Sequence, residues 1–281
     1  MSVRDLSPST ESMLDLPLGK VDLWFTLTDR VDPGLAAQYH ALLTGQELVQ
    51  HDRFYFEKDR LRYLVTRALA REALSRYVPV AAHEWRFEAD RYGKPRIVNP
   101  TGLAKQINFN ISHTDGLVII GFSLERALGV DIENVQRQAR LDVAERFFSA
   151  SESLRLRRLS PQLQAIRFWE LWTLKESYIK ARGMGLSLPL DQFTFHLEEP
   201  RDVSIEFVTG FDDFASRWQF WQMRPTEHHL LAVCVETPAE DNPPNWFCVR
   251  EVTPLSTHFT VHCPIDRCSG DQSSPLSRSQ T

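Results

Sequence analysis

Apolar positions along the chain follow two periods, one typical of strands and one typical of helices. Where apolar and polar residues alternate, as in VDLWFTLT at 21–28, we expect a β-strand. Where apolar residues recur every three or four positions, we expect an amphipathic helix, and two long stretches do so, at 58–78 and 165–183. The further strand-like segments are 84–90, 107–113, 116–124, 129–135, 193–198, 204–208, 218–223 and 230–236.

These elements occur in the same order in two halves of the chain. Because strands and helices are mixed without regular βαβ alternation, we predict the α+β class, with two similar halves. We place the N-terminal half at 19–128 and the C-terminal half at 129–253. Residues 1–18 are polar and terminal and are expected to be mobile, and residues 254–281 are Ser-rich and are expected to form a disordered tail.

Composition excludes several classes of protein. With 281 residues, 42% of them hydrophobic and 25% charged, the chain is typical of a soluble globular protein. A formal net charge of -5 argues against general nucleic-acid binding. The longest apolar stretch, 117–124, is too short to cross a membrane, and residues 1–20 lack the apolar core of a signal peptide. We therefore expect a cytoplasmic protein that does not bind membranes.

The four cysteines are expected to be free thiols in a reducing compartment. Cys234 lies in the apolar run LLAVCV, where a buried structural cysteine is the simplest interpretation. His258, His262, Cys263 and Cys268 lie close together in the sequence, but their spacing fits no standard structural zinc pattern. Zinc binding is therefore disfavoured.

Two groups of residues suggest chemistry at an acidic site. Asp131 and Glu133 are two residues apart on a predicted strand, so both carboxylates emerge on one face, where a hard divalent cation would relieve their repulsion. Trp172, Glu176 and Lys180 follow at steps of four on one helix face. If the two faces met, three carboxylates would bind one Mg²⁺ and Lys180 would be available to a phosphate. The alternatives are a solvated strand face and a surface Glu–Lys pair.

Further candidates are individually weaker. Glu152 and Ser149 match the S-x-x-E capping box, a structural role that is compatible with a catalytic one. His113 is predicted at a strand end beside Ser112, where it suits a phosphate contact or an ordinary loop position. The cations that would join these residues in binding a polyanion are Arg62, Lys94 and Lys175.

Five strings, taken in order, resemble the Sfp-type (surfactin-synthetase-activating) 4'-phosphopantetheinyl transferases. They are YGKP at 92–95, NISH at 110–113, GVDIE at 129–133, RFFSASE at 146–152 and LWTLKESYIKARGMGLSLPL at 171–190. The resemblance covers residues from about 20 to about 240 and implies a fold of two α+β halves related by a pseudo-twofold axis.

The resemblance also implies the roles of single residues. Mg²⁺ would be bound by Asp131, Glu133 and Glu176, and Lys180 would contact the pyrophosphate of coenzyme A. The other phosphate contacts would come from Arg62, Lys94, Ser112 and His113. Glu152 and Lys175 match positions associated with the active site, and either Glu176 or Glu152 would be the general base.

The reaction implied is transfer of the 4'-phosphopantetheine arm of coenzyme A to a serine of an apo acyl or peptidyl carrier protein. A basic run containing Arg155, Arg157 and Arg158 lies where the family contacts its acidic carrier, although a solvated helix face explains it equally well. Because both halves of the site lie on one chain, we expect a monomer. Two alternatives remain: a relative that binds carriers or coenzyme A without transfer, and a Mg²⁺-dependent nucleotide phosphohydrolase.

Overall fold

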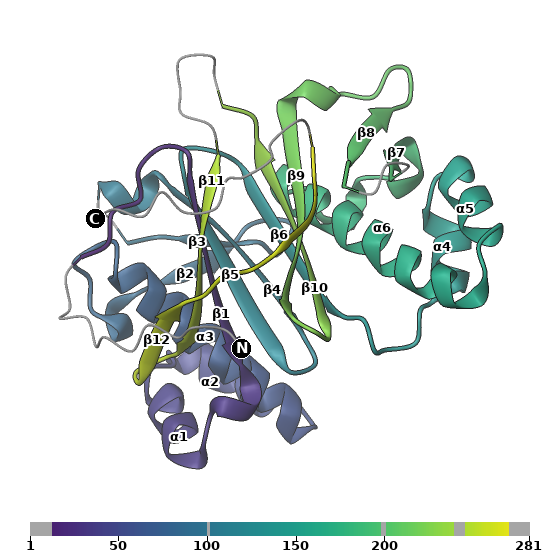
Figure 1. Cartoon of the computed structure of the whole chain (residues 1–281). Coiled ribbons are helices and arrows are strands. Elements are labelled where there is room, and N and C mark those ends of the chain that lie inside the picture. The colour runs from purple at the N-terminus through teal and green to yellow at the C-terminus, as the bar shows by residue number, and fades with distance from the viewer. Residues whose placement is uncertain (1–12, 100–101, 198–200, 239–244, 270–281) are drawn as a thin grey trace. The chain divides into compact units, whose positions relative to one another are not determined.

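The computed structural model describes residues 13–99, 102–197, 201–238 and 245–269. They form two compact units: unit 1 contains the described residues up to Glu125 and those at 245–262, and unit 2 contains the described residues at 126–238 and 263–269. Each unit combines helices with a largely antiparallel sheet, so the predicted α+β class is confirmed (Figure 1).

Unit 1 is built on a five-stranded sheet with strand order β12-β11-β1-β5-β4. Its strands are β1 (Lys20–Leu27), β4 (Ile107–Thr114), β5 (Leu117–Leu124), β11 (Trp246–Thr253) and β12 (Thr257–Thr260). Only β1 and β11 pair in parallel. A two-stranded ribbon and three helices complete the unit: β2 (Phe87–Ala89), β3 (Pro95–Ile97), α1 (Pro33–Ala41), α2 (Gly45–Asp52) and α3 (Glu57–Ser75).

The long helix α3 covers the unit 1 sheet because its apolar stripe matches the sheet's buried face. Leu64, Val65, Ala68 and Leu69 of α3 join one hydrophobic core with side chains of β1, β4 and β5. The helix predicted from the period of residues 58–78 is therefore confirmed, as are strands at β1, β4 and β5.

Unit 2 also combines a sheet with one long helix. The sheet is antiparallel and has four strands in the order β13-β9-β10-β6. The strands are β6 (Leu128–Asn134), β9 (Trp218–Thr226), β10 (His229–Glu236) and β13 (Ile265–Cys268). The remaining elements are α4 (Leu141–Phe147), α5 (Ala150–Arg157), α6 (Pro161–Arg182) and the ribbon β7 (Phe193–His196) and β8 (Ser204–Phe207). Helix α6 begins with Pro161 at its first position and ends at Gly183, whose φ of 67° only glycine adopts easily.

Helix α6 packs on β6 and β10 at unusually close range at Gly129. A Cβ at this position would lie 2.0 Å from the carbonyl oxygen of Ser177 and 2.4 Å from the nitrogen of Ala181. Because the two contacts are with helix backbone, no side-chain movement relieves them. Gly129 therefore sets the distance between β6 and the helix.

Gly129→Ala is expected to lower the free energy of unfolding by at least about 1–3 kcal/mol, the range for overpacking a tight interior. Urea unfolding measures the effect, with Gly45→Ala as control because a Cβ at Gly45 meets nothing within 4 Å. Equal stability of the two variants would show that β6 and α6 separate without strain.

The C-terminal segment differs from the sequence-based boundaries. Residues 246–253, which were placed in the C-terminal half without a predicted strand, form β11 and pair with β1 of unit 1, and residues 257–260 and 265–268 form strands although a disordered tail was expected from residue 254. The turn between β11 and β12 is anchored because the buried Tyr39 hydroxyl donates to the carbonyl of Pro254 (2.8 Å). Residues 270–281 lie outside the described residues.

The expected mobile segment 1–18 lies mostly outside the described residues. From residue 13 onward the chain packs on unit 1: Leu16 is buried, and the Leu14 nitrogen donates to the Arg76 carbonyl (2.6 Å). The short helices α1, α2 and α4, each of seven to nine residues, were not anticipated, because so few turns leave little periodicity to detect.

Candidate active site

Asp131 lies two positions after Gly129, the point of close contact between β6 and α6, on the face of the strand that meets the helix. Its side chain is buried, and its Oδ1 accepts a hydrogen bond from Lys180 Nζ at 2.7 Å. Lys180 Nζ also donates to the carbonyl of Val130 (3.2 Å). The strand and the helix therefore bring together the two residues that the sequence placed on separate elements.

Glu176 lies one helical turn before Lys180 and is half-buried. Burial, and after it the negative charge of Asp131, raises the pKa of Glu176; Lys180 opposes the rise, Glu133 adds to it, and the net pKa is about 7. Glu133 itself accepts from Arg137 Nη1 at 3.0 Å. Three carboxylates and two cations thus form one cluster with an excess of negative charge.

The cluster has the donor chemistry of a divalent-cation site but is not in a ligating arrangement. Among the described residues, no three His, Cys, Asp or Glu side chains converge closely enough to hold a metal ion. Asp131 and Glu133 are turned toward Lys180 and Arg137 instead. Burial and, after it, repulsion by Asp131 and Glu133 raise the pKa of Glu176, and a hard cation with oxygen ligands would relieve this repulsion. The residues therefore fit Mg²⁺ once Lys180 and Arg137 release Asp131 and Glu133 to the metal ion.

The metal-free protein is expected to lose stability as the pH rises from about 4.5 to about 7. In this window the folded state keeps a proton on Glu176 that the unfolded chain, with its ordinary pKa of 4.5, has released. Folding is therefore favoured at the acid end, and this contribution is lost as the pH passes the folded pKa. Urea unfolding across this range should show a flatter profile for Glu176→Gln, and an unchanged slope would contradict the assignment.

Glu152 and Lys175, which were expected near the active site, pair with each other inside unit 2. Both side chains are fully buried, with Lys175 Nζ 2.8 Å from Glu152 Oε2. Lys175 Nζ also donates to the carbonyls of Leu190 and Phe193, both at 2.8 Å. Glu152 accepts from the nitrogens of Ser149 (2.9 Å) and Phe195 (2.8 Å) and so closes the predicted capping box. This ion pair joins α5, α6 and β7 inside the core.

In unit 1, Arg62 lies beside the turn that follows the NISH string. Its guanidinium pairs with Asp59 (2.7 Å) and with Asp115 (3.6 Å), and Asp115 lies between β4 and β5. On β4 itself, Ser112 is buried and His113 is exposed. The structure therefore brings Arg62 to the end of the strand that carries Ser112 and His113.

Lys94 lies in the turn between β2 and β3. Asp90 shapes this turn, because its Oδ1 accepts from the nitrogens of Tyr92 (2.8 Å) and Lys94 (3.0 Å). Burial lowers the pKa of Lys94, and the charge of Asp90 opposes that shift. Lys94 is thus an ammonium group in a constrained turn, which suits an anionic ligand.

Two charged residues that contact the elements carrying the acidic cluster, Arg137 and Asp213, were missed from the sequence. Arg137, which neutralises Glu133, follows it by four residues just after a strand, where only a helical spacing rule would have drawn attention to it. Asp213 was missed because it lies in a loop far from α6 in sequence.

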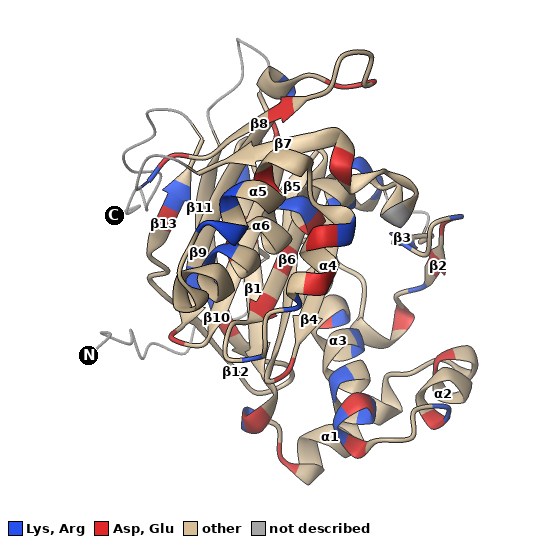
Figure 2. Ribbon diagram, turned by 90° about the vertical axis from the view of Figure 1, so that its right-hand side faces the viewer, with Lys and Arg blue, Asp and Glu red and all other residues tan. Residues whose placement is uncertain are grey.

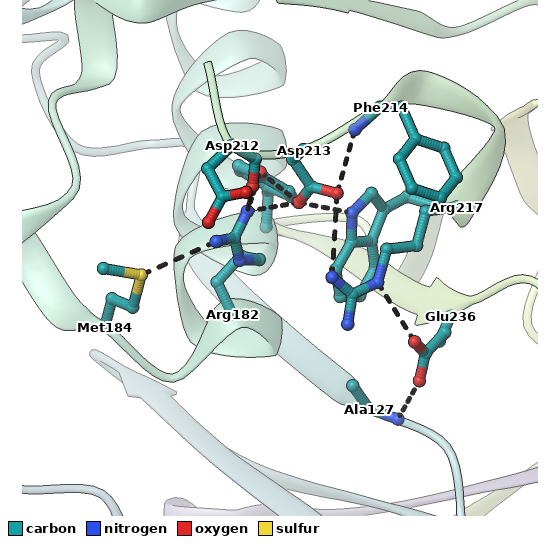
Figure 3. Close-up of polar contacts among 10 residues, drawn as sticks. Ala127, Arg182, Met184, Asp212, Asp213, Phe214, Arg217 and Glu236 are labelled. Atoms are coloured by element: carbon teal, nitrogen blue, oxygen red, sulfur yellow. Dashed lines mark hydrogen bonds and ion pairs between the residues drawn. The ribbon is translucent and has the colours of Figure 1, made fainter. Parts of the chain in front are cut away.

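Asp213 anchors the C-terminal turn of α6 (Figure 3). Its buried carboxylate accepts from Arg182, from the Tyr178 hydroxyl (2.7 Å) and from Trp218 Nε1 (2.8 Å). Arg182 extends the network to the sulfur of Met184 in the following loop. These contacts lie on the face of α6 opposite to Glu176 and Lys180, so they fix the helix without involving those two side chains.

Comparison with known proteins identifies the family. The family model described as the 4'-phosphopantetheinyl transferase superfamily matches residues 127–234, and that described as 4'-phosphopantetheinyl transferase, N-terminal, matches residues 35–124. The chain belongs to this family, and within it to the Sfp-type proteins. It is a 4'-phosphopantetheinyl transferase.

Several curated relatives support this assignment. A 4'-phosphopantetheinyl transferase of Bacillus subtilis is 34% identical over 198 residues, which are 70% of this chain and 84% of the relative. The Sfp transferase of Bacillus subtilis strain 168 is 39% identical over 55% of this chain and 66% of its own length. The HetI transferase of a Nostoc species is 28% identical over 79% of this chain and 90% of its own length.

Within the described residues, every helix is too short or too polar to cross a bilayer.

Proposed function

We propose that this transferase moves 4'-phosphopantetheine from coenzyme A to a serine of an apo acyl or peptidyl carrier protein and releases adenosine 3',5'-bisphosphate. The observation that best supports the proposal is the cluster on β6 and α6, where Glu176 faces Asp131 and Glu133 beside Lys180. Such a cluster combines the ligands of a hard cation with a group that binds phosphate.

The chemistry needs alignment and charge stabilisation more than covalent catalysis. The serine oxygen attacks the β-phosphorus, a new P–O bond forms, and the bond from that phosphorus to the bridging oxygen breaks. The bridging oxygen leaves with the electron pair on adenosine 3',5'-bisphosphate. Mg²⁺ held by Asp131, Glu133 and Glu176 would neutralise the pyrophosphate. Lys180 donates to the leaving phosphate, because its ammonium already lies at the edge of the cluster.

The serine proton goes to Glu176, directly or through a water that it holds. The other candidate base, Glu152, is buried against Lys175. We therefore propose Glu176 as the acceptor of the serine proton.

The cations of unit 1 serve the remaining phosphates of coenzyme A. Arg62 and His113 belong to neighbouring parts of that unit, with the hydroxyl of Ser112 next in sequence, and Lys94 projects from the β2–β3 turn. Guanidinium, imidazole and ammonium donors together suit a ligand with several phosphate groups, including a 3'-phosphate.

Mass spectrometry of a purified apo carrier incubated with the enzyme, Mg²⁺ and coenzyme A tests the proposal. A gain of the phosphopantetheine mass on the carrier is expected. Cleavage of coenzyme A without that gain would favour a phosphohydrolase, and neither product would favour a binding-only relative. Using fatty-acid, polyketide and peptide-synthetase carriers in parallel also shows which class the enzyme prefers.

The basic run on α5 is proposed to steer the acidic carrier (Figure 2). Arg157 and Arg158 are exposed, with Arg157 3.7 Å from Glu145, and Arg155 lies 3.0 Å from Nδ1 of His196. Leu154 on the same helix is 48% exposed, which adds an apolar contact to the surface.

Reversing Arg157 and Arg158 to glutamate is expected to raise the KM for the carrier about tenfold and to leave the KM for coenzyme A unchanged. Surface charges act on the rate of encounter, and salt screens them. The difference in carrier KM between the variant and the wild type should therefore shrink at high ionic strength. Reversal of Arg201, which is exposed elsewhere in unit 2, is the control. A carrier KM equal to that of the wild type would show that α5 is not part of the docking surface.

We further infer that the enzyme acts as a monomer, because the candidate residues of both units lie on one chain, and in the cytoplasm, because its four cysteines are free thiols. Sedimentation during turnover tests the oligomeric state.

A further inference from the structure

Four residues, one from each strand, lie opposite one another across the whole sheet of unit 2. Asp131 of β6 pairs with Ala232 of β10, Ala232 pairs with Gln222 of β9, and Gln222 pairs with Arg267 of β13. Directly opposed residues of antiparallel strands point to the same face. We call Asp131, Ala232, Gln222 and Arg267 the cross-strand row.

Three members of the row make polar contacts with α6. Asp131 pairs with Lys180 at 2.7 Å. Gln222 Nε2 donates to the carbonyl of Glu170 (2.9 Å) and to the hydroxyl of Thr173 (3.1 Å). The remaining contact joins Arg267 Nη2 to Glu170 Oε1 at 3.5 Å.

The order of these contacts along the helix matches the order of the strands. From Asp131 to Arg267 the row spans three strand spacings, about 14 Å. From Lys180 back to Glu170 the helix rises by ten residues, about 15 Å. The helix therefore runs along the row, and each polar contact fixes one point of it.

Apolar packing alone would not fix this register as firmly. Side chains in a hydrophobic interface tolerate small shifts, whereas a hydrogen bond between buried groups weakens steeply when its distance or angle changes. Gln222 is 1% exposed, and the side chains of Arg267 and Glu170 are 11% and 13% exposed. Losing the Gln222 contact would remove one donor from the Glu170 carbonyl and the Thr173 hydroxyl, and losing the Arg267 contact would leave Glu170 paired only with Arg167 of its own helix, at 2.8 Å.

We propose that Gln222 and Arg267 are positioning residues that hold α6 in register so that Glu176 and Lys180 meet Asp131. This inference rests on the proposed function of that cluster. It also gives a role to β13, which lies beyond the residues matched by the family model, 127–234. The strand that was expected to be part of a disordered tail supplies one end of the row.

Gln222→Met and Arg267→Gln test the proposal, because both remove the contact with α6: the first keeps the length of the side chain, and the second shortens it and removes its charge. The matched control is Arg224→Gln, which removes the Arg224–Asp266 ion pair (2.7 Å) between the same two strands. Mg²⁺ affinity is read from the metal-induced rise in melting temperature, and amide exchange of residues 174–182 reports on the helix without metal. Arg267→Lys should retain most of the wild-type behaviour.

We expect Mg²⁺ affinity to weaken about tenfold in Gln222→Met and Arg267→Gln, the scale seen when groups supporting metal ligands are removed. Exchange of the α6 amides should accelerate in the same two variants and not in Arg224→Gln. Exchange and affinity equal to those of the control would overturn the positioning role. A wild-type enzyme without Mg²⁺ binding would instead refute the proposed metal site, and the exchange comparison would still decide whether the row holds α6.

Discussion

Asp131→Asn is expected to abolish phosphopantetheinyl transfer, with kcat/KM lower by about 10³ or more, while the protein remains folded. Asparagine has nearly the volume of aspartate, so the contact of β6 with α6 is not disturbed. What changes is charge: the cluster loses one carboxylate, Lys180 loses its partner at 2.7 Å, and the pKa of Glu176 falls toward its ordinary value. The Lys180 side chain is 25% exposed, so water can solvate its ammonium and the folded state is little affected.

Three measurements separate this expectation from simple destabilisation. Thermal unfolding should place the variant within a few degrees of wild type, the rise of melting temperature with Mg²⁺ should disappear, and carrier modification should be lost even at saturating coenzyme A. Asp142→Asn is the matched control, because Asp142 is an exposed carboxylate paired with Arg140 at 2.8 Å. If Asp131→Asn modifies the carrier as fast as the wild type at limiting Mg²⁺, Asp131 is not part of the catalytic cluster.

The part of this site that could be predicted from sequence depends on local geometry. The two-residue period of a strand places Asp131 and Glu133 on one face, and the helical period places Glu176 and Lys180 on another. Their meeting was inferred only as a possibility, and the structure shows it in the Lys180–Asp131 contact. Gly129, which permits the close approach, stands two residues before Asp131. The residues next to it in sequence do not indicate that helix backbone lies 2.0 Å from the position a Cβ would occupy.

Features that depend on contacts distant in sequence could not be predicted. The capping box at Ser149 and Glu152 is a local pattern, and it was recognised, but the burial of Glu152 depends on Lys175 and on the Phe195 nitrogen. In the same way, β13 has only four residues, and the places of β11 and β13 in the two sheets depend on partners more than 40 positions away along the chain. Serine-rich composition after residue 269 obscured the shorter strands before it.

Lys175→Met is expected to lower the free energy of unfolding by about 3–5 kcal/mol, the range for removing one partner of a buried ion pair. Methionine keeps the volume, so the loss comes from the charge left behind: Glu152 stays in the core with no ammonium beside it, and the carbonyls of Leu190 and Phe193 each lose a donor. Urea unfolding measures the change. Arg157→Met, which removes an exposed pair with Glu145, should shift stability by less than about 1 kcal/mol.

The double variant Glu152→Gln with Lys175→Met identifies the source of the effect. If an unpaired buried charge causes the instability, neutralising Glu152 should recover part of the loss, because a neutral pair needs no compensating cation. Below its melting temperature the Lys175→Met enzyme should keep a KM for coenzyme A close to that of wild type, since Lys175 is fully buried and bonded within the core. A stable Lys175→Met protein that has lost transfer would instead place Lys175 in contact with substrate, as its position in the family's motif suggests.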